Sequence, residues 1–265
     1  MTTRPDAVNG RVAVITGACR GIGRRLAEVL AADGYSLALL DVQRPDETLD
    51  AVQEAGVDAE AVIVDVSVES EVASSAARVL DRFGRVDVLV NNAGVTLIAA
   101  AEDTSAEQWR QVLDVNLTGP FLLCRAFGRS MLERRRGSII NIASIAGLLG
   151  FSDRAAYNAS KHGLIGLTRT LAVEWGGRGV RVNAVCPSWV KGDKDAAYRA
   201  SGAYTDEDIT DNVPLARFAT PDDVARAVAF LADERQSGYV NGHTLSVDGG
   251  WYADGSWRRL RLSKR

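Results

Sequence analysis

Tyr157 and Lys161 stand four positions apart in a segment with the apolar periodicity of a helix. On a helix, this spacing places both side chains on one face, one turn apart. A free tyrosine has a pKa of about 10 and is a poor base near neutral pH. A neighbouring ammonium group favours the phenolate and lowers that pKa, so the pair can move a proton at a substrate oxygen.

Two polar residues can complete this group. Ser144 ends a predicted strand and can hold the reacting oxygen with a second hydrogen bond. Asn116 falls within a helical pattern, where a carboxamide is mildly unfavourable, and it can hold a water that extends a proton relay through Lys161. Taken singly, each residue also has an ordinary role: helix packing for Tyr157, solvated charge for Lys161, a cap for Ser144 and a kink for Asn116. The prediction of acid–base catalysis depends on their joint occurrence.

A glycine-rich segment follows the first predicted strand and opens a helix. It reads Thr16-Gly17-Ala18-Cys19-Arg20-Gly21-Ile22-Gly23. Glycine permits a tight turn and a close approach of the backbone to a pyrophosphate, and a helix N-terminus offers N–H groups and a positive dipole. A turn without a ligand is the alternative, but the position between a strand and a helix favours nucleotide binding.

Asp41 ends the second predicted strand and bears on the choice of nucleotide. A carboxylate there can accept hydrogen bonds from the adenosine ribose hydroxyls and would repel a 2′-phosphate. Arg20 and Arg44 argue the other way, because either could pair with a 2′-phosphate, although both are also ordinary surface charges. We expect the carboxylate to outweigh them, so NAD is favoured over NADP. The positive nicotinamide ring would further lower the pKa of Tyr157.

Two further strand ends carry candidate contacts to such a cofactor. Asp65-Val66 closes the third strand and can hydrogen-bond an adenine, and Asp65 can also cap the next helix. Asn91-Asn92-Ala93-Gly94 follows the fourth strand. Its small residues would let the backbone touch the cofactor, while its amides could tie neighbouring strands together.

Short apolar segments alternate with longer amphipathic ones along the whole chain. Near-continuously apolar strands that alternate with helices predict a parallel sheet with right-handed crossovers. We therefore predict an α/β fold in which residues 1–265 form a single doubly wound, Rossmann-type domain with helices on both faces. The predicted strands are Val12–Thr16, Ser36–Asp41, Ala61–Asp65, Val86–Asn91, Gly137–Ala143, Val180–Val185 and His243–Val247, and the main helices are Ile22–Asp33, Glu69–Phe83, Ala155–Trp175 and Pro221–Ala232.

Residues 188–215 break this alternation with a polar, charged stretch. Because they begin at the carboxyl end of the sixth strand, where ligands bind in such sheets, we predict a substrate lid rather than a surface excursion without a role. Residues 252–265 form a C-terminal tail that is rich in arginine. We interpret this tail as solvated, with nucleic-acid binding as the alternative.

Composition excludes several classes of protein. The chain is 46% hydrophobic and 25% charged with a net charge of −3, which is ordinary for a globular domain and argues against a nucleic-acid-binding function. No apolar run approaches the roughly 20 residues that cross a membrane, and the polar start predicts no signal peptide. Three scattered cysteines and two histidines predict free thiols, no metal site and a cytoplasmic location.

Together, the motifs resemble the classical short-chain dehydrogenase/reductase family, over roughly residues 10–251. The matching segments are Thr16-Gly17-x3-Gly21-Ile22-Gly23, Asn91-Asn92-Ala93-Gly94, Ser144, Tyr157-x3-Lys161, Cys186-Pro187 and Val247-Asp248-Gly249-Gly250. The resemblance implies a seven-stranded sheet, hydride transfer between NAD(P) and an alcohol or carbonyl, and commonly a homotetramer. It implies the catalytic tetrad Asn116, Ser144, Tyr157 and Lys161. The predicted cofactor site comprises Gly17, Cys19, Arg20, Gly21, Ile22, Gly23, Asp41, Asp65, Val66, Asn91, Ala93, Gly94, Tyr157, Lys161, Pro187 and Val190.

One segment departs from the family pattern. Where the family has Pro-Gly-x-Val-x-Thr, this chain reads Pro187-Ser188-Trp189-Val190-Lys191-Gly192. Gly192 thus stands where the family has the threonine that touches the nicotinamide carboxamide, and it is directly preceded by Lys191, which either points elsewhere or serves the cofactor or the substrate. This departure leaves hydride transfer itself intact.

The predicted substrate pocket has an apolar wall and a charged lid. This favours a small polyhydroxylated or acidic substrate: a sugar, polyol or hydroxy acid. Trp189 can stack on a sugar face or simply pack. The predicted substrate residues are Ser144, Ile145, Ala146, Tyr157, Trp189 and Lys191, with Val95, Thr96, Leu97, Leu148 and Tyr198 nearby.

Two other functions compete with an NAD-dependent alcohol or sugar dehydrogenase. An NADPH-dependent 3-oxoacyl-[acyl-carrier-protein] reductase could dock its acidic carrier on Arg125, Arg129 and Arg169, but Asp41 and the apolar Val173 argue against it. A non-catalytic NAD-binding regulator is the alternative of another class. Such a protein would have little reason to retain all four residues of the tetrad.

Overall fold

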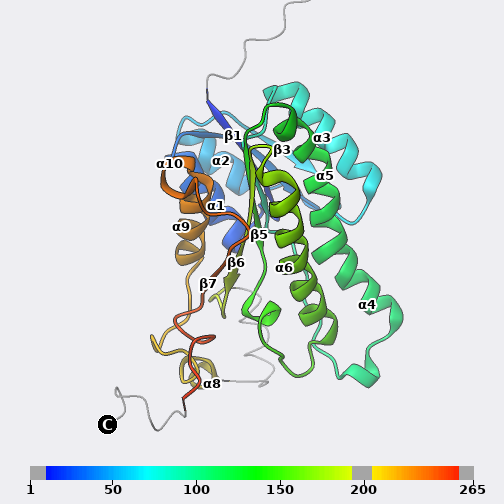
Figure 1. Ribbon diagram of the computed structural model, residues 1–265, viewed down its shortest axis with the longest axis vertical. Coiled ribbons are helices and arrows are strands. Elements are labelled where there is room, and N and C mark those ends of the chain that lie inside the picture. Colours follow the sequence, from blue (N-terminus) through cyan, green and yellow to red (C-terminus); the bar gives the residue numbers. More distant parts are fainter. Residues whose placement is uncertain (1–9, 193–204, 257–265) are drawn as a thin grey trace, which may run out of the picture.

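The computed structural model describes residues 10–192 and 205–256, and within them the chain forms a seven-stranded parallel sheet. The strand order is β3-β2-β1-β4-β5-β6-β7 (Figure 1). The predicted doubly wound α/β fold is therefore confirmed. The strands are β1 (Arg11–Thr16), β2 (Tyr35–Asp41), β3 (Ala59–Ile63), β4 (Val88–Asn91), β5 (Gly137–Ile142), β6 (Val180–Pro187) and β7 (Thr244–Val247).

The strand order reverses at β1, which pairs with β2 on one side and with β4 on the other. Crossovers that leave in opposite directions open a crevice at this point, beyond the carboxyl ends of the strands. We call this end of the sheet the carboxyl edge, and the opposite end the amino edge. The glycine-rich segment after β1 and the Asn91–Gly94 segment after β4 therefore both lie at the carboxyl edge.

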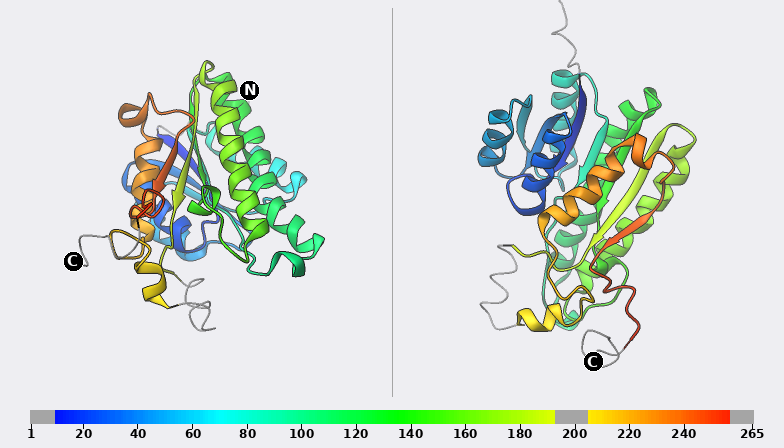
Figure 2. Two further views of the ribbon diagram at one scale, coloured as in Figure 1. Left: turned by 60° about the horizontal axis from the view of Figure 1, so that its bottom comes forward. Right: turned by 90° about the vertical axis from the view of Figure 1, so that its left-hand side faces the viewer.

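Helices cover both faces of the sheet, as Figures 1 and 2 show. Helices α1, α2 and α9 bury apolar side chains in the core on one face, and α3, α5 and α6 do so on the other. The helical segments are α1 (Gly21–Ala32), α2 (Asp46–Glu54), α3 (Glu69–Phe83), η1 (Ala101–Asp103), α4 (Ala106–Leu113), η2 (Asp114–Thr118), α5 (Gly119–Glu133), η3 (Ile145–Gly147), α6 (Ala155–Gly176), α8 (Asp206–Thr210), α9 (Pro221–Ala232) and α10 (Glu234–Ser237). None of the helices in these ranges is long and apolar enough to cross a membrane.

Several predicted boundaries shift by one or two residues. The prediction that β3 runs to Asp65 is wrong, because the strand ends at Ile63 and the Asp65 carboxylate accepts hydrogen bonds from the backbone and hydroxyl of Ser67. Strand β6 extends past its predicted end to Pro187, since it pairs with β7 over that length. Helix α9 begins and ends as predicted, with Thr220 accepting from the Asp223 N–H in a capping box.

The segment around Asn116 is a π-helical turn between α4 and α5 rather than regular α-helix. Such turns widen the helix by one residue and reposition one side chain. Asn116 is fully buried, and its carboxamide faces the loop after β4. Asn116 therefore lies mid-helix as expected, but in a π-helical turn, and its amide contacts the loop after β4.

The described parts of the predicted lid, residues 188–192 and 205–215, pack at the carboxyl edge. Val190 forms a bridge with Ala219, and the Lys191 N–H donates to the Ala219 carbonyl at 3.0 Å. Gly249 has a φ of +63°, and a Cβ there would meet the Val213 side chain at 2.4 Å. The glycine pair after β7 therefore lets this segment lie against the end of the sheet. Residues 193–204, which include Tyr198, lie outside the described residues, as do residues 257–265 of the basic tail.

Candidate active site

In the glycine-rich loop, Gly17 and Gly23 are closely packed against their neighbours, whereas Gly21 faces open space. Gly17 and Gly21 have φ values of +68° and +57°, the left-handed region that favours glycine. A Cβ on Gly23 would lie 1.8 Å from the Gly17 carbonyl oxygen, whereas a Cβ on Gly21 would meet nothing within 4 Å. The N-cap Arg20 is exposed and does not cap the helix with its side chain. The first backbone N–H groups of α1, including those of Ile22 and Gly23, are thus available to an anion.

Asp41 lies against this loop. Its carboxylate accepts from the Cys19 N–H at 2.9 Å, so β2 and the loop are joined where the adenosine ribose of a dinucleotide is expected. Burial, reinforced by the hydrogen bond and charge of Asp41, raises the pKa of the Cys19 thiol to about 12. The Arg44 side chain donates to Asp46 at 2.7 Å, so this arginine already has an anionic partner.

Asp65 and Val66 follow β3 at the same edge. The N-cap of α3 is Val68, so the alternative that Asp65 caps this helix is wrong; its carboxylate instead closes a turn with Ser67. The Asp65 N–H donates to Glu71 at 2.8 Å. Val66 packs closely on Gly119, where a Cβ would lie 2.9 Å from the Val66 carbonyl oxygen.

The amides after β4 tie neighbouring strands together, as predicted. Asn91 donates to the Asn141 carboxamide of β5 at 2.8 Å, and the Asn92 side chain donates to the Thr16 and Gly17 carbonyls. The Ala93 N–H donates to the Thr16 hydroxyl at 3.0 Å. These bonds hold the ends of β1, β4 and β5 in one rigid frame.

Ser144 and Tyr157 meet at the carboxyl edge beside β5. The Ser144 hydroxyl accepts from the Ala146 N–H at 3.1 Å. Burial raises the pKa of Tyr157, and a hydrogen bond with Ser144 and the charge of Arg154 act in the opposite direction. The predicted lowering of this pKa is therefore wrong for the protein alone, because desolvation outweighs the favourable groups, which are Ser144 and Arg154 rather than Lys161.

A backbone carbonyl at the end of β5 holds Lys161 in place. Its side chain is 4% exposed, and its Nζ donates to the Ile142 carbonyl at the end of β5 at 2.8 Å. The same Nζ lies 5.7 Å from the centre of the Tyr157 ring. Helix α6 thus brings both side chains to one side, as their spacing predicts.

Asn116 acts as a clamp between three elements. Its Oδ1 accepts from the Val95 N–H at 2.8 Å, and its Nδ2 donates to the Val95 carbonyl at 2.8 Å and to the Ser160 hydroxyl at 3.1 Å. A Cβ on Gly94 would lie 3.3 Å from Oδ1 and 3.7 Å from the Lys161 ammonium. Asn116 therefore fixes the loop after β4 against helix α6, next to Lys161.

An aromatic cluster lies beside the tetrad. Trp189 stacks on Trp251 with ring centres 4.8 Å apart, and Phe151 packs edge-on against both rings. The Arg154 guanidinium lies 5.8 Å from the centre of the Trp189 ring. The stack supports the packing role of Trp189, since Trp251 covers one of its faces.

Sequence reasoning did not find Phe151, Arg154 or Trp251. Arg154 stands three residues before Tyr157, so its i, i+3 spacing was the signal that could have identified it. Trp251 directly follows the glycine pair at the end of β7, but its contact with Trp189 depends on how residues far apart in the sequence meet. Nothing local indicates that contact.

The remaining predicted substrate and cofactor residues occupy the same edge. Ile145 and Ala146 form η3 and are buried, as is Pro187 at the end of β6. The side chain of Lys191 is exposed, and its ammonium lies 5.8 Å from the centre of the Phe218 ring. In this structure the Lys191 ammonium therefore lies near Phe218, which follows the predicted lid segment.

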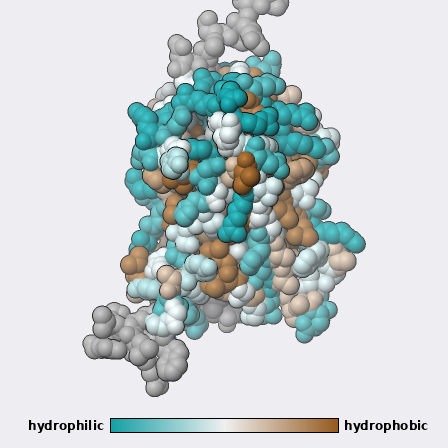
Figure 3. All heavy atoms as spheres, viewed as in Figure 1, coloured by the Kyte–Doolittle hydropathy of each residue, from teal (hydrophilic) through white to brown (hydrophobic). Residues whose placement is uncertain are grey.

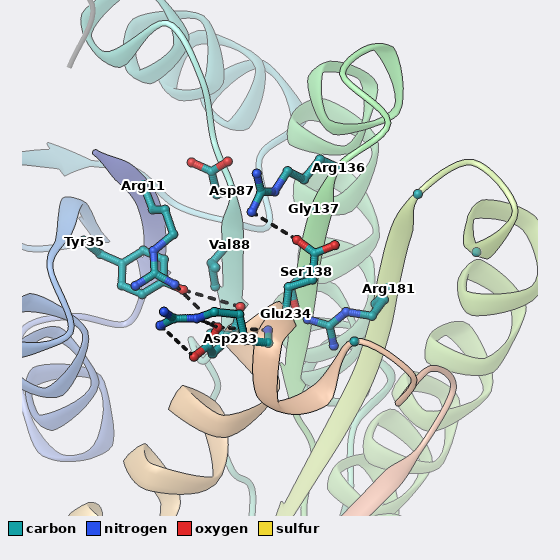
Figure 4. A pocket seen from close by; sticks show the side chains of 15 residues that line it. Arg11, Tyr35, Asp87, Val88, Arg136, Gly137, Ser138, Arg181, Asp233 and Glu234 are labelled. Carbon is teal, nitrogen blue, oxygen red and sulfur yellow. Dashed lines mark hydrogen bonds and ion pairs between the residues drawn. The ribbon is translucent and has the colours of Figure 1, made fainter. Parts of the chain in front are cut away.

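A hollow of about 490 Å³ lies at the amino edge (Figure 4). Its charged side chains are largely paired with one another: Arg136 with Glu234 at 3.0 Å and Arg11 with Asp233 at 3.8 Å. Arg181 donates to the Leu231 carbonyl at 2.8 Å. Because these groups satisfy one another, we interpret the hollow as structural.

The sequence profile described as enoyl-(acyl carrier protein) reductase matches residues 17–252, which covers most of the chain. The chain belongs to the short-chain dehydrogenase/reductase family. The match includes residues 17–23 of the glycine-rich loop, the predicted tetrad and the glycine pair after β7.

The chain is similar in sequence to dehydrogenases and reductases whose named substrates differ. The chain is 43% identical over 91% of its length to an uncharacterized short-chain type dehydrogenase/reductase of Sinorhizobium fredii, but spans 44% of that protein's length. It is 40% identical to a 3-oxoacyl-[acyl-carrier-protein] reductase of Synechocystis (92% of this chain, 98% of the relative). It is 39% identical to a D-threitol dehydrogenase of Mycolicibacterium smegmatis (92% and 94%). Family membership is thus clear, while the named substrates differ.

A solved dehydrogenase structure has the same fold. The crystal structure of a putative NAD(P) dependent gluconate 5-dehydrogenase from Beutenbergia cavernae, with bound NADP at low occupancy, is 43% identical. It matches with a TM-score of 0.88 over 94% of this chain and 99% of that one. The predicted membership of the short-chain dehydrogenase/reductase family and the seven-stranded fold are both confirmed.

Proposed function

We propose that this protein is an NAD-dependent dehydrogenase that oxidises a secondary alcohol on a small polyhydroxylated compound, or reduces the corresponding carbonyl. The observation that carries the proposal is the meeting of Ser144, Tyr157 and Lys161 at the carboxyl edge, beside the glycine-rich loop. The relatives that act on D-threitol and gluconate support a polyol or sugar-derived substrate.

The residues present fit a dinucleotide. The outer side of the loop at Gly21 is open, and the tight packing at Gly17 and Gly23 leaves no side chain between the backbone and a pyrophosphate. Asp41 lies beside the loop, where it would accept hydrogen bonds from ribose hydroxyls. When bound, the nicotinamide accepts or supplies the hydride.

The proton follows a path through this chain's own residues. In the oxidation direction, the Tyr157 oxygen takes the proton of the substrate hydroxyl. Ser144 holds its own oxygen through the Ala146 N–H, which leaves its hydroxyl proton to donate to the reacting oxygen. Lys161, held by the Ile142 carbonyl, places a positive charge near the phenol and favours the phenolate that forms during turnover.

Asp41 supports the choice of NAD. A 2′-phosphate at its position would meet a carboxylate, while Arg44 is already paired with Asp46. Because the similar structure from Beutenbergia cavernae holds NADP, the two cofactors are compared directly. We expect wild-type kcat/KM to be higher with NAD⁺ than with NADP⁺.

The substitution Asp41→Asn should lower this cofactor ratio on the order of 100-fold, because it removes the like-charge repulsion. Glu47→Gln, an exposed acid on the neighbouring helix α2, is the matched control and should leave the ratio unchanged. Equal or better turnover with NADP⁺ in the wild type would refute the NAD assignment.

The structure favours the rival carrier-protein reductase less than the sequence does. Arg125, one of the three arginines that could dock an acidic carrier, forms an ion pair with Glu69. Reduction of acetoacetyl-coenzyme A by NADPH at a rate exceeding that of any polyol would nevertheless establish this rival function.

We also propose that the protein assembles as a homotetramer. The exposed apolar side chains of Phe121 on α5 and Val173 on α6, which are 43% and 85% exposed, support a subunit interface on these two helices. Light scattering during gel filtration should give four times the chain mass of 28.4 kDa. A monomer mass would contradict this assembly.

A further inference from the structure

Arg154 brings a guanidinium to the carboxyl edge without a carboxylate partner in the described chain. Its backbone forms a parallel bridge with Ala99, whose N–H donates to the Asp153 carbonyl at 2.9 Å. Its Nη1 donates to the Thr96 hydroxyl at 3.3 Å, and the guanidinium faces the Trp189 ring. The loop after β4 therefore holds the start of α6, and with it Arg154, in a defined place.

Several other partly buried arginines have stronger or more numerous acceptors than Arg154 has. Arg25 pairs with Glu28 and Asp222 at 2.8 and 2.7 Å, and Arg134 pairs with Asp87. A guanidinium carries five N–H donors, and a side chain that is partly removed from water needs acceptors for them. The one hydroxyl that Arg154 contacts leaves most of its donors for a ligand.

The surroundings of Arg154 match one end of a substrate. Tyr157 lies one helical turn further along α6, and the charge of Arg154 acts on its hydroxyl. Trp189, Trp251 and Phe151 form an apolar wall on the same side. If Arg154 binds an anionic group of the substrate, the carbons next to that group lie within reach of the Tyr157 oxygen. The C–H groups of these carbons would pack on the aromatic rings.

We propose that Arg154 binds a carboxylate of the substrate, which makes the natural substrate a polyhydroxylated acid rather than a neutral polyol. This inference rests on the proposed dehydrogenase function. The planar fork of a guanidinium matches a carboxylate with two parallel hydrogen bonds, and a lysine ammonium does so less well. A neutral polyol would offer Arg154 hydroxyls but no charge.

The test compares substrates that differ in this group alone. The pairs are D-gluconate with D-glucitol and D-threonate with D-threitol. Turnover is followed as NADH formation from NAD⁺, and binding is measured by calorimetry in the presence of NADH. The variants are Arg154→Gln, Arg154→Lys and the control Arg178→Gln, an exposed arginine beyond the far end of α6. Circular dichroism and NADH affinity verify that each variant is folded.

We expect the wild type to prefer the acid of each pair in both affinity and kcat/KM. In Arg154→Gln this acid-over-polyol preference should fall on the order of 100-fold, and Arg154→Lys should restore part of it. Arg178→Gln should retain the full preference.

Equal binding of acid and polyol by the wild type, or no binding of either acid, would overturn the inference. An equal loss for both substrates in Arg154→Gln, together with a shifted pH profile, would also overturn it, because Arg154 would then act only on the pKa of Tyr157. Binding of the acids without turnover of any probe would support the carboxylate site and refute the proposed dehydrogenase function. Turnover of the polyols without acid binding would refute the carboxylate site alone.

Discussion

The charged and polar side chains at the two ends of the sheet differ in how fully they are paired. At the amino edge, charged side chains form a mutually satisfied network: Asp87 accepts from Arg85, Arg134 and the Val12 N–H. Hydrophilic side chains gather at this end of the molecule, which is uppermost in Figure 3. At the carboxyl edge, Tyr157 and Arg154 lie partly buried with few partners.

This difference indicates that the amino edge contributes to the stability of the fold and the carboxyl edge to the reaction. Paired and hydrogen-bonded charges lower the free energy of the folded state, while polar groups with spare bonding capacity are costly unless a ligand uses it. Substitutions at the amino edge should therefore change stability and leave the reaction intact. Substitutions at the carboxyl edge should do the reverse.

The largest expected effect comes from Tyr157→Phe. Loss of the hydroxyl removes the group that takes the proton, so kcat/KM should fall by about 10³-fold while cofactor affinity stays nearly the same. Steady-state kinetics and NADH fluorescence titration measure the two quantities. Unchanged turnover would refute the assigned base and would return the non-catalytic regulator to consideration.

Tyr35→Phe is the matched control at the amino edge. Burial raises the pKa of Tyr35 as it does that of Tyr157, and its hydroxyl donates to the Ala232 carbonyl at 3.4 Å. The same deletion of one oxygen should cost about 1 kcal/mol of stability and leave kcat/KM unchanged. A large loss of activity here would break the proposed separation between the two edges.

Asp87→Asn should lower stability by about 2–3 kcal/mol, because it weakens hydrogen bonds to charged partners at a side chain that is 7% exposed. Burial alone would raise the pKa of Asp87, but hydrogen bonds from Arg85 and Val12 and the nearby arginine charges lower it overall. A lowered folded-state pKa contributes stability above the unfolded pKa of about 4, and this contribution is lost as the pH falls further.

Thermal unfolding at several pH values tests this assignment. The wild-type Tm should fall faster below pH 4 than that of Asp87→Asn, and both proteins should retain similar kcat/KM at neutral pH. Identical acid sensitivity of the two proteins would contradict the role of the Asp87 charge.

The smallest effect concerns Cys19, beside Asp41. With a pKa of about 12, its thiol should react with iodoacetamide at pH 8.5 far more slowly than free cysteine, because the thiolate is the reactive form. Asp41→Asn should accelerate labelling several-fold, as measured by peptide mass spectrometry. Labelling of wild-type Cys19 at the rate of free cysteine would contradict the charged Asp41–Cys19 contact.

The sequence alone determined the elements and the local pairs. Alternating apolar and amphipathic segments predicted a parallel α/β sheet because periodicity and burial follow from local residue order. Tyr157 and Lys161 share one side of α6 because a helix repeats every 3.6 residues. The glycine-rich loop was likewise readable, since its conformation depends on Gly17 and Gly21 themselves.

Only the tertiary structure decided how these parts act on one another. The raised pKa of Tyr157 depends on how deeply α6 is buried, and the clamp of Asn116 on Val95 depends on a π-helical turn. The stacking of Trp189 on Trp251 joins the ends of β6 and β7, which lie far apart in the sequence. Contacts between such segments, and the burial and charge effects that follow from them, arise only when the chain packs. Local sequence patterns therefore do not predict them.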